Sequence, residues 1–361
     1  MIGRGAPSVG RVRPGNGSRQ TALPGPVAHG CVFVEHLMTN RSPTGPCRKR
    51  ALVLDPRYRF YVEARLGLLH KVTRSTLTLT ATIPTSHPSA AVLGTTRSGT
   101  GCLVDDDGHI LTVNYVVLGA TAVSLADCEG RAIPAELIAQ DFATGVAVVR
   151  AAAELDIAPL APGDSRDLEI GEPLFIVASA GDGERRANSG VLTSLDPFDA
   201  YWEYRLERAV WTTCANPGLG GGPVCNRFGE VVGVASLNLG TIGRATLAIP
   251  VENYFDYADE LLTHGRRVSR PKRPWVGMFC YALPGRTVVA GLVPGAPAED
   301  CGLEVGDVIA SVDGRPVQAR AELYGHIWRH DPGEIVCFDV YREGKMLSVP
   351  VRSTDVEEFF G

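Results

Sequence analysis

Residues 98–117 read SGTGCLVDDDGHILTVNYVV and contain two short apolar runs separated by the turn sequence DDDGH. Runs of four to eight β-branched or apolar residues, interrupted by Asp, Asn and Gly, are typical of strands joined by tight turns. The stretch therefore predicts a β-hairpin, and it directs attention to similar runs on either side.

Such runs continue over most of the middle of the chain. The first set comprises TLTLTATI (76–83), AVSLAD (122–127), AIPAELIAQD (132–141) and GVAVVRA (145–151). The second set comprises PLFIVAS (173–179), ANSGVLTSL (187–195), RAVWTT (208–213), GPVCN (222–226), EVVGVASL (230–237) and RATLAIP (244–250). Together they predict a mainly β fold in which residues 75–264 form two barrels of about six strands each. A helical pattern over 251–267, with Gly265 as a stop signal, closes this region.

The composition agrees with a β-rich globular protein. The 361 residues include 41 glycines and 25 prolines, and the net charge of -5 gives no reason to expect a nucleic-acid partner. Residues 1–50 are basic and rich in Pro and Gly, so we expect a disordered arm, without membrane contact. Residues 51–74 form a leader segment whose pattern fits either a helix or a strand. Residues 265–273 are basic, contain Pro, and are expected to be an exposed linker.

Several classes of site are not supported by the residues. The nine cysteines have neither C-x-x-C nor Cys/His ligand spacing, so we expect no zinc site, no other metal and no cofactor. No run reaches the roughly 18 apolar residues of a membrane span, and residues 1–30 lack the apolar core of a secretory signal. On these residues alone, export is not expected.

Three segments carry a family resemblance, and two short ones support it. Residues 98–117, DFATGVAVVR (141–150) and NPGLGGGPVCNRFGEVVGV (216–234) resemble, in order and spacing, the catalytic segments of HtrA/Deg-type trypsin-like serine proteases. GDS (163–165) and LAIP (247–250) fit the same pattern. The resemblance implies a trypsin-like double β-barrel, and a triad whose members occur in the chain order His, Asp, Ser.

The resemblance places the three triad positions on Tyr115, Gly145 and Gly220. A tyrosine has a pKa near 10 and is a poor base at neutral pH, and glycine has no side chain with which to orient a base or attack a carbonyl. The backbone amides of Gly218 and Gly220 could still form an oxyanion-hole-like nest, although Leu219 replaces the family's Asn. We therefore predict an inactive member with no intact catalytic residue. A relocated site using His87, with Cys214 or Cys225 as nucleophile, is the alternative.

Residues 274–354 resemble a PDZ domain of the HtrA type, and GAPAEDCGLEVGDVI (295–309) is the most specific match. Such domains add an extended C-terminal peptide to a sheet edge and hold its carboxylate with the amides of an apolar-Gly-apolar loop. The alternative is that the apolar residues are ordinary core and the groove is unused. The predicted peptide-binding residues are Trp275, Val276, Gly277, Met278, Leu323 and Ile327.

These observations favour a pseudoprotease: a barrel scaffold that binds polypeptides, joined to a PDZ domain that recognises protein C-termini. The alternative is an active serine endopeptidase of protein quality control with an unrecognised catalytic group. A structural subunit is a third option, because the resemblance implies homo- or hetero-trimers, although no trimer contact can be read from the sequence. The resemblance also implies the cell envelope or periplasm, while the missing signal leaves a cytoplasmic location open.

Overall fold

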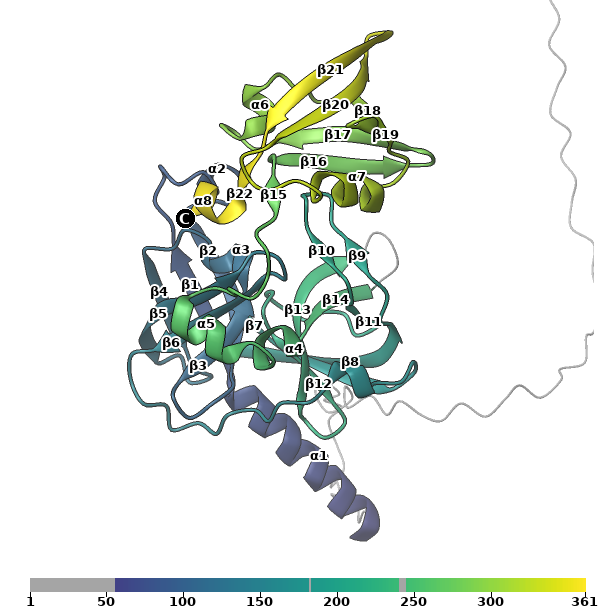
Figure 1. The fold of residues 1–361 in the computed structure, drawn as a ribbon. Coiled ribbons are helices and arrows are strands. Elements are labelled where there is room, and N and C mark those ends of the chain that lie inside the picture. Colours follow the sequence, from purple (N-terminus) through teal and green to yellow (C-terminus); the bar gives the residue numbers. More distant parts are fainter. Residues whose placement is uncertain (1–55, 182, 240–244) are drawn as a thin grey trace, which may run out of the picture. The chain divides into compact units, whose positions relative to one another are not determined.

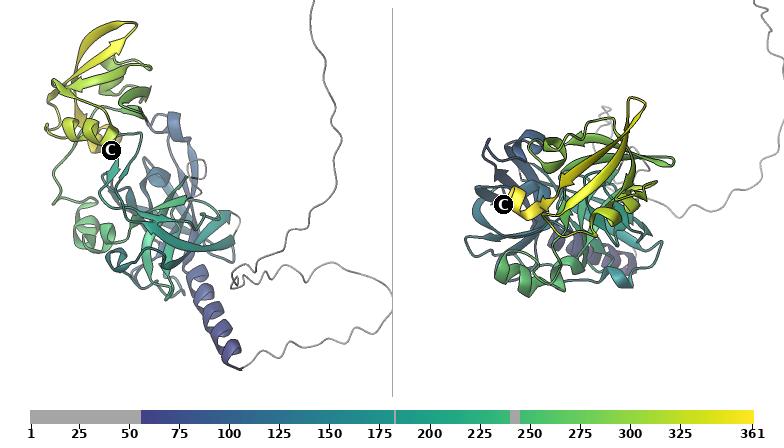
Figure 2. Two further views of the ribbon diagram at one scale, coloured as in Figure 1. Left: turned by 90° about the vertical axis from the view of Figure 1, so that its right-hand side faces the viewer. Right: turned by 45° about the horizontal axis from the view of Figure 1, so that its top comes forward.

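A computed structural model describes residues 56–181, 183–239 and 245–361. The predicted arm over 1–50 lies outside the described residues, as does the beginning of the leader segment. The remainder of the leader forms helix α1 (Pro56–Arg74), which decides between the two alternatives. This helix extends away from the barrels (Figure 1 and Figure 2), and Val72 near its end is buried in the core. Among the described helices, none is long and apolar enough to cross a membrane.

The first half of residues 75–264 is a closed six-stranded antiparallel barrel. The hairpin predicted from residues 98–117 forms, and its two strands pair through Cys102 with Leu111 and Leu103 with Ile110. The strand order is β1-β2-β3-β6-β5-β4. The strands are β1 (Thr76–Thr82), β2 (Thr96–Leu103), β3 (His109–Val113), β4 (Ala122–Ala126), β5 (Ala132–Asp141) and β6 (Val146–Ala151). Two short helices interrupt them, α2 (Ala90–Leu93) and α3 (Asn114–Val117).

The second half is another closed barrel, with the order β11-β14-β13-β12-β7-β8. Its strands are β7 (Pro173–Gly181), β8 (Glu184–Ser194), β11 (Val210–Thr212), β12 (Pro223–Asn226), β13 (Val231–Leu239) and β14 (Ala245–Pro250). A 3-10 turn, η1 (Ser165–Asp167), precedes it. Between β8 and β11 the chain leaves the barrel as a two-stranded ribbon of β9 (Phe198–Asp199) and β10 (Arg205–Leu206). The predicted double six-stranded barrel is confirmed.

The helical pattern after the second barrel forms two helices where the sequence suggested one. They are α4 (Glu252–Phe255) and α5 (Ala258–His264), separated at Asp256 and Tyr257, because Tyr257 departs from helical backbone angles. Gly265 ends α5 in the left-handed conformation, with φ of 70°. A Cβ is disfavoured at that angle, which explains why a glycine stands there.

The C-terminal module is a second β-rich fold with its own core. Its six-stranded sheet has the order β16-β17-β18-β20-β21, with β19 paired to β18. The strands are β16 (Met278–Leu283), β17 (Arg286–Leu292), β18 (Val308–Val312), β19 (Arg315–Pro316), β20 (Ile335–Arg342) and β21 (Lys345–Arg352). Strand β15 (Pro274–Trp275) pairs with β22 (Thr354–Asp355). The helices are α6 (Pro297–Asp300), α7 (Arg320–Ile327) and α8 (Val356–Phe360). Strand β16 is an edge of the sheet, and α7 packs against it (Figure 1).

Candidate functional site

Tyr115 lies on α3, directly after β3, in the position predicted for the catalytic base. Its hydroxyl donates a hydrogen bond to the Ser236 carbonyl at 2.8 Å, and its own carbonyl accepts one from Arg97 Nη1 at 3.0 Å. Burial raises the pKa of the Tyr115 phenol to about 12. The group is therefore a protonated hydrogen-bond donor at neutral pH, and it cannot accept a proton from a nucleophile.

Gly220, in the position predicted for the nucleophile, lies directly against Tyr115. A Cβ added at Gly220 would stand closer than 3.0 Å to the Tyr115 hydroxyl oxygen and 3.4 Å from the Ser236 carbonyl oxygen. Real Cβ atoms essentially never approach another heavy atom so closely. The phenol thus occupies the volume that a serine side chain would need.

The third predicted triad position, Gly145, is covered by another aromatic residue, Tyr204. Gly145 adopts φ of +78°, and a Cβ there would lie 3.2 Å from the Tyr204 hydroxyl oxygen. The Tyr204 hydroxyl donates a hydrogen bond to the carbonyl of Thr144, the residue before Gly145. This bond holds the Tyr204 ring in place. An aspartate at 145 would face both a strained backbone and a tyrosine.

The loop that was expected to form an oxyanion nest is held by bonds to its neighbours. The Gly218 amide donates to Asn216 Oδ1 at 3.2 Å, and the Leu219 amide donates to the Ser179 carbonyl at 2.8 Å. The Gly220 carbonyl accepts from the Thr100 amide at 2.7 Å. One of the two predicted nest amides is thus occupied by a side chain of the same loop, and retention of the nest stays a prediction.

The alternative catalytic groups are engaged elsewhere. The ring nitrogens of His87 lie 2.7 Å from Ser89 Oγ and 2.9 Å from the Phe360 carbonyl. Burial raises the pKa of the Cys214 thiol to about 11, and it raises that of Cys225 as well. A thiol with a raised pKa is a poor nucleophile at neutral pH.

In the C-terminal module, all five predicted peptide-binding residues that have a side chain are buried. Val276, Met278, Leu323 and Ile327 are at most 1% exposed and belong to the core of the module. The Trp275 ring packs against Phe359 and Phe360 of α8, with centroid distances of 4.9 and 5.4 Å. These side chains therefore belong to the packed core of the domain, and their part in peptide binding stays a prediction.

The loop over residues 275–278 does hold a carboxylate, that of Glu203 from the β9–β10 ribbon. The amides of Val276, Gly277 and Met278 all donate to its two oxygens. Gly277 adopts φ of 84°, which brings its amide to the carboxylate. Sequence reasoning missed Glu203, whose only local signal is the run Tyr201, Trp202, Glu203, Tyr204, an acidic residue among aromatic ones in a turn.

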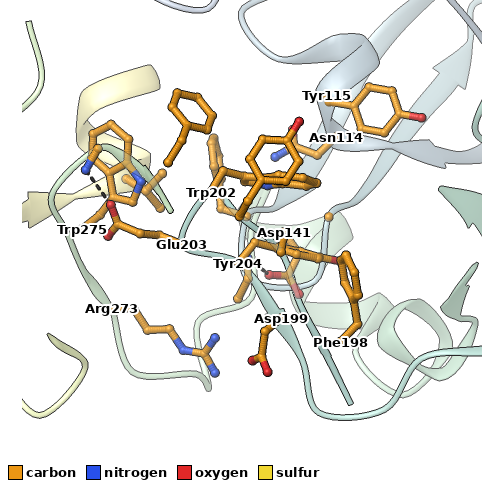
Figure 3. Close-up of a pocket in the computed structure, with 18 of the residues that line it drawn as sticks. Asn114, Tyr115, Asp141, Phe198, Asp199, Trp202, Glu203, Tyr204, Arg273 and Trp275 are labelled. Atoms are coloured by element: carbon orange, nitrogen blue, oxygen red, sulfur yellow. Dashed lines mark hydrogen bonds between the residues drawn. The ribbon is translucent and has the colours of Figure 1, made fainter. Parts of the chain in front are cut away.

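A cavity of about 1040 Å³ connects these two regions. It is lined on one side by Tyr115 and Asn114, and on another by Trp275 and the basic linker residue Arg273. Figure 3 shows Glu203 pointing to the loop beside Trp275, while Tyr115 lies across the cavity. The cavity has aromatic walls and is lined by both acidic and basic side chains.

Comparison with known proteins agrees with this architecture. Residues 99–234 match the trypsin-like peptidase domain, and residues 265–352 match the PDZ domain. A DegP-like periplasmic serine endoprotease of Halomonas elongata is 32% identical over 276 residues, 71% of this chain and 56% of that protein. One from Hahella chejuensis is 30% identical over 70% of this chain and 56% of its own length. The chain thus spans about half the length of the curated relatives it matches. A solved structure, the HtrA-type protease AlgW with tripeptide, is 20% identical and covers 80% of this chain and 96% of its own, with a TM-score of 0.49.

The class of protein is therefore a trypsin-like peptidase fold joined to a PDZ domain. Within that class, the chain belongs to the HtrA/Deg-type serine protease family.

Proposed function

We propose that this chain is a pseudoprotease, which binds polypeptide segments on an HtrA-type scaffold without hydrolysing them. The observation that carries the proposal is the Tyr115 hydroxyl lying where the nucleophile's Cβ would stand. Two further observations support it. The predicted base position holds Tyr115, a phenol with a raised pKa, and the predicted carboxylate position holds Gly145, which Tyr204 covers. Loss of nucleophile and base from a comparable triad lowers turnover by roughly 10⁶-fold.

The decisive measurement is hydrolysis of fluorescently labelled, unfolded casein by the purified chain at neutral pH, with trypsin as positive control. We expect a rate that cannot be distinguished from buffer. Hydrolysis that persists through purification to homogeneity, and that a serine-reactive inhibitor abolishes, would overturn the proposal in favour of the active endopeptidase named for the relatives.

A reconstituted variant, Tyr115→His with Gly145→Asp and Gly220→Ser, tests how much of the machinery remains. Tyr115→His frees the space for the serine, but residue 145 keeps its positive φ and faces Tyr204. We therefore expect at most a small part of a working protease's activity. Strong activity would show that the oxyanion amides persist and that only the chemistry has been lost.

The PDZ domain supplies the second half of the proposed function, recognition of protein C-termini. A loop with three convergent amides beside an edge strand is the arrangement by which such domains bind a terminal carboxylate. The partners proposed are therefore unfolded polypeptides and exposed C-termini. Suppression of aggregation of thermally unfolded citrate synthase, measured by light scattering, tests the first partner class. No suppression at a stoichiometric excess of the chain would contradict it.

The relatives' names make the periplasm the proposed compartment. A C-terminal fusion to alkaline phosphatase, which folds only where its disulfides form, would be active if the chain is exported in its native host. A fusion that is expressed but inactive would place the protein in the cytoplasm.

A further inference from the structure

Glu203 is a buried carboxylate at the turn of the β9–β10 ribbon, with 8% of its surface exposed. Its Oε1 accepts hydrogen bonds from the Gly277 amide at 2.7 Å and the Met278 amide at 2.8 Å. Its Oε2 accepts one from the Val276 amide at 3.0 Å. Three convergent amides satisfy most of the acceptor capacity of a carboxylate that water does not reach.

The residues before Glu203 pair with the PDZ domain through their backbone. The Tyr201 carbonyl accepts a hydrogen bond from the Cys280 amide on the edge strand β16, at 2.6 Å. On the opposite side, the Tyr324 hydroxyl on α7 donates to the Ala200 carbonyl at 2.6 Å and accepts from the Glu203 amide at 3.0 Å. The segment Ala200–Glu203 therefore lies between β16 and α7.

Side chains of this segment also rest on the same strand. The Tyr201 ring lies 6.0 Å from that of Phe279 and 6.2 Å from that of Tyr281, centroid to centroid. Ala200 is fully buried, whereas Tyr201 keeps 45% of its surface exposed. The segment is a bend at the tip of the ribbon, yet it makes two of the contacts of a PDZ ligand: a backbone hydrogen bond to the edge strand and a carboxylate held by the loop amides.

We propose that Ala200–Glu203 is an internal ligand of the PDZ domain, with the Glu203 side-chain carboxylate in the place of a chain-terminal carboxylate, so that an external C-terminus binds only by displacing it. This inference rests on the proposed recognition of C-termini, and it adds how that recognition is regulated. A bound peptide and the docked ribbon compete for the same three amides.

Two features of Glu203 make the docked state displaceable. The residue adopts φ of 48°, an unfavourable angle for a side chain, because the backbone must turn away from the loop and continue into Tyr204. Burial, opposed by the three amide bonds, raises the pKa of Glu203 to about 7, so its ionised form is held at a desolvation cost. A true C-terminus ends at its carboxylate and needs no such turn.

Release would also reach the barrel, because Tyr204 is the next residue along the chain. Its ring stacks on Trp202 at 5.9 Å, and its hydroxyl covers Gly145. Occupancy of the PDZ groove is thereby coupled to the wall of the former triad site.

The test compares the full-length chain with Glu203→Gln and with the control Glu207→Gln, whose side chain is 69% exposed near the same ribbon. Glutamine offers one acceptor oxygen and turns an NH₂ group toward an amide donor, which weakens docking. The probe is a fluorescein-labelled decapeptide ending in Ala-Tyr-Trp-Val with a free carboxylate, and the same peptide amidated. We expect Glu203→Gln to bind the free-acid peptide at least about tenfold more tightly than the unmodified chain does. Glu207→Gln should bind it like the unmodified chain, and the amidated peptide should bind to neither.

Hydrogen exchange of residues 275–282, followed by mass spectrometry without any peptide, separates the internal contact from peptide recognition. Faster exchange in Glu203→Gln, together with tighter peptide binding, supports both the internal ligand and the recognition of C-termini. Faster exchange without peptide binding by any variant upholds the internal ligand and overturns recognition of C-termini. Exchange unchanged by Glu203→Gln overturns the internal ligand. Should Glu203→Gln fail to fold, Tyr324→Phe removes two bonds to the same segment and carries the same expectations.

Discussion

Tyr115 and Gly220 are complementary in size, since the phenol fills the space that a side chain at 220 would take. The hydroxyl gains a hydrogen bond to the Ser236 carbonyl, so the aromatic residue is held in place from two sides. The two replacements depend on each other, because a side chain at 220 and the Tyr115 hydroxyl cannot coexist without movement. At the residue scale, the two predicted triad positions pack directly against each other.

This dependence predicts a coupling energy that equilibrium unfolding in urea can measure. Gly220→Ala should lower the free energy of unfolding by about 1–3 kcal/mol through overpacking. In a Tyr115→Phe background, which lacks the obstructing hydroxyl, we expect the same change to cost less than about 1 kcal/mol. Gly67→Ala in helix α1, where a new Cβ meets nothing within 4 Å, is the unobstructed reference, and helix propensity should raise its free energy of unfolding by up to about 1 kcal/mol. Equal costs in both backgrounds would show that the two positions are independent.

Glu203 predicts a pH dependence of peptide binding. Its pKa is raised from 4.5 to about 7 when docked, mainly by burial, so docking takes up a proton between those values. The docked state is then strengthened as pH falls from 7 to 5, and peptide affinity should fall by up to about tenfold per unit. The neighbouring Cys280 and Tyr324 have raised pKa values and stay neutral over this range, and Arg320 lies close to both groups.

Fluorescence titrations of the labelled decapeptide between pH 5 and 8 measure this effect. Glu203→Gln is the reference, because titration of the peptide's own carboxylate affects it equally. If the ratio of peptide affinities between the unmodified chain and Glu203→Gln does not change with pH, the assignment to Glu203 is contradicted.

At the scale of elements, strand β8 joins the two barrels through one side chain. Arg185 donates from Nε to the Thr76 carbonyl at 2.8 Å, from Nη2 to the Ala126 carbonyl at 2.7 Å, and from Nη1 to Thr78 Oγ1 at 2.9 Å. All three acceptors belong to the first barrel, whereas β8 belongs to the second. The adjacent Arg186 is exposed and pairs only with Glu184 on its own strand, among the contacts of the described residues.

The pair provides a matched test of the contact between barrels. Arg185→Ala should lower the free energy of unfolding by about 2–3 kcal/mol, since it removes three donors from part-buried acceptors. Arg186→Ala should change it by less than about 0.5 kcal/mol. Chemical denaturation followed by circular dichroism gives both values, and comparable losses would mean that the Arg185 bonds contribute little.

At the scale of the molecule, the segment between the barrels and the PDZ domain is held on both sides. Arg270 lies 3.5 Å from Asp141 in the first barrel, and Arg266 lies 3.4 Å from Glu357 in α8. The Arg273 guanidinium lies 4.2 Å from the centroid of the Trp328 ring. A stretch that its composition marks as an exposed linker is thus tied to its surroundings by basic side chains.

Docking of Glu203 should therefore protect this linker from proteolysis. We expect limited digestion with trypsin to cut between residues 266 and 273 several-fold faster in Glu203→Gln than in the unmodified chain. Excess decapeptide should accelerate cleavage of the unmodified chain in the same way. Mass spectrometry of the products identifies the site, and Glu207→Gln digested at the rate of Glu203→Gln would count against a specific role of residue 203.

Much of this protein follows from its sequence alone. Alternating runs such as 76–83 and turn residues such as DDDGH act over a few neighbours, so they predict strands and hairpins without knowledge of the fold. The flanking motifs likewise name Tyr115, Gly145 and Gly220 as the candidate triad positions, and this assignment stays a prediction. Helix α1 could not be predicted, since its pattern fitted two structures equally.

The contacts at the two ends of the cavity needed the tertiary structure. Glu203 meets the amide of Gly277 across 74 positions, and Tyr115 meets Ser236 across 121. No local pattern encodes which backbone amides a distant carboxylate will reach, because that depends on how the barrel and the ribbon are closed. Which side chains stand at positions 115, 145 and 220 is a property of the sequence. What packs around these positions is decided by contacts between segments that only the folded chain brings together.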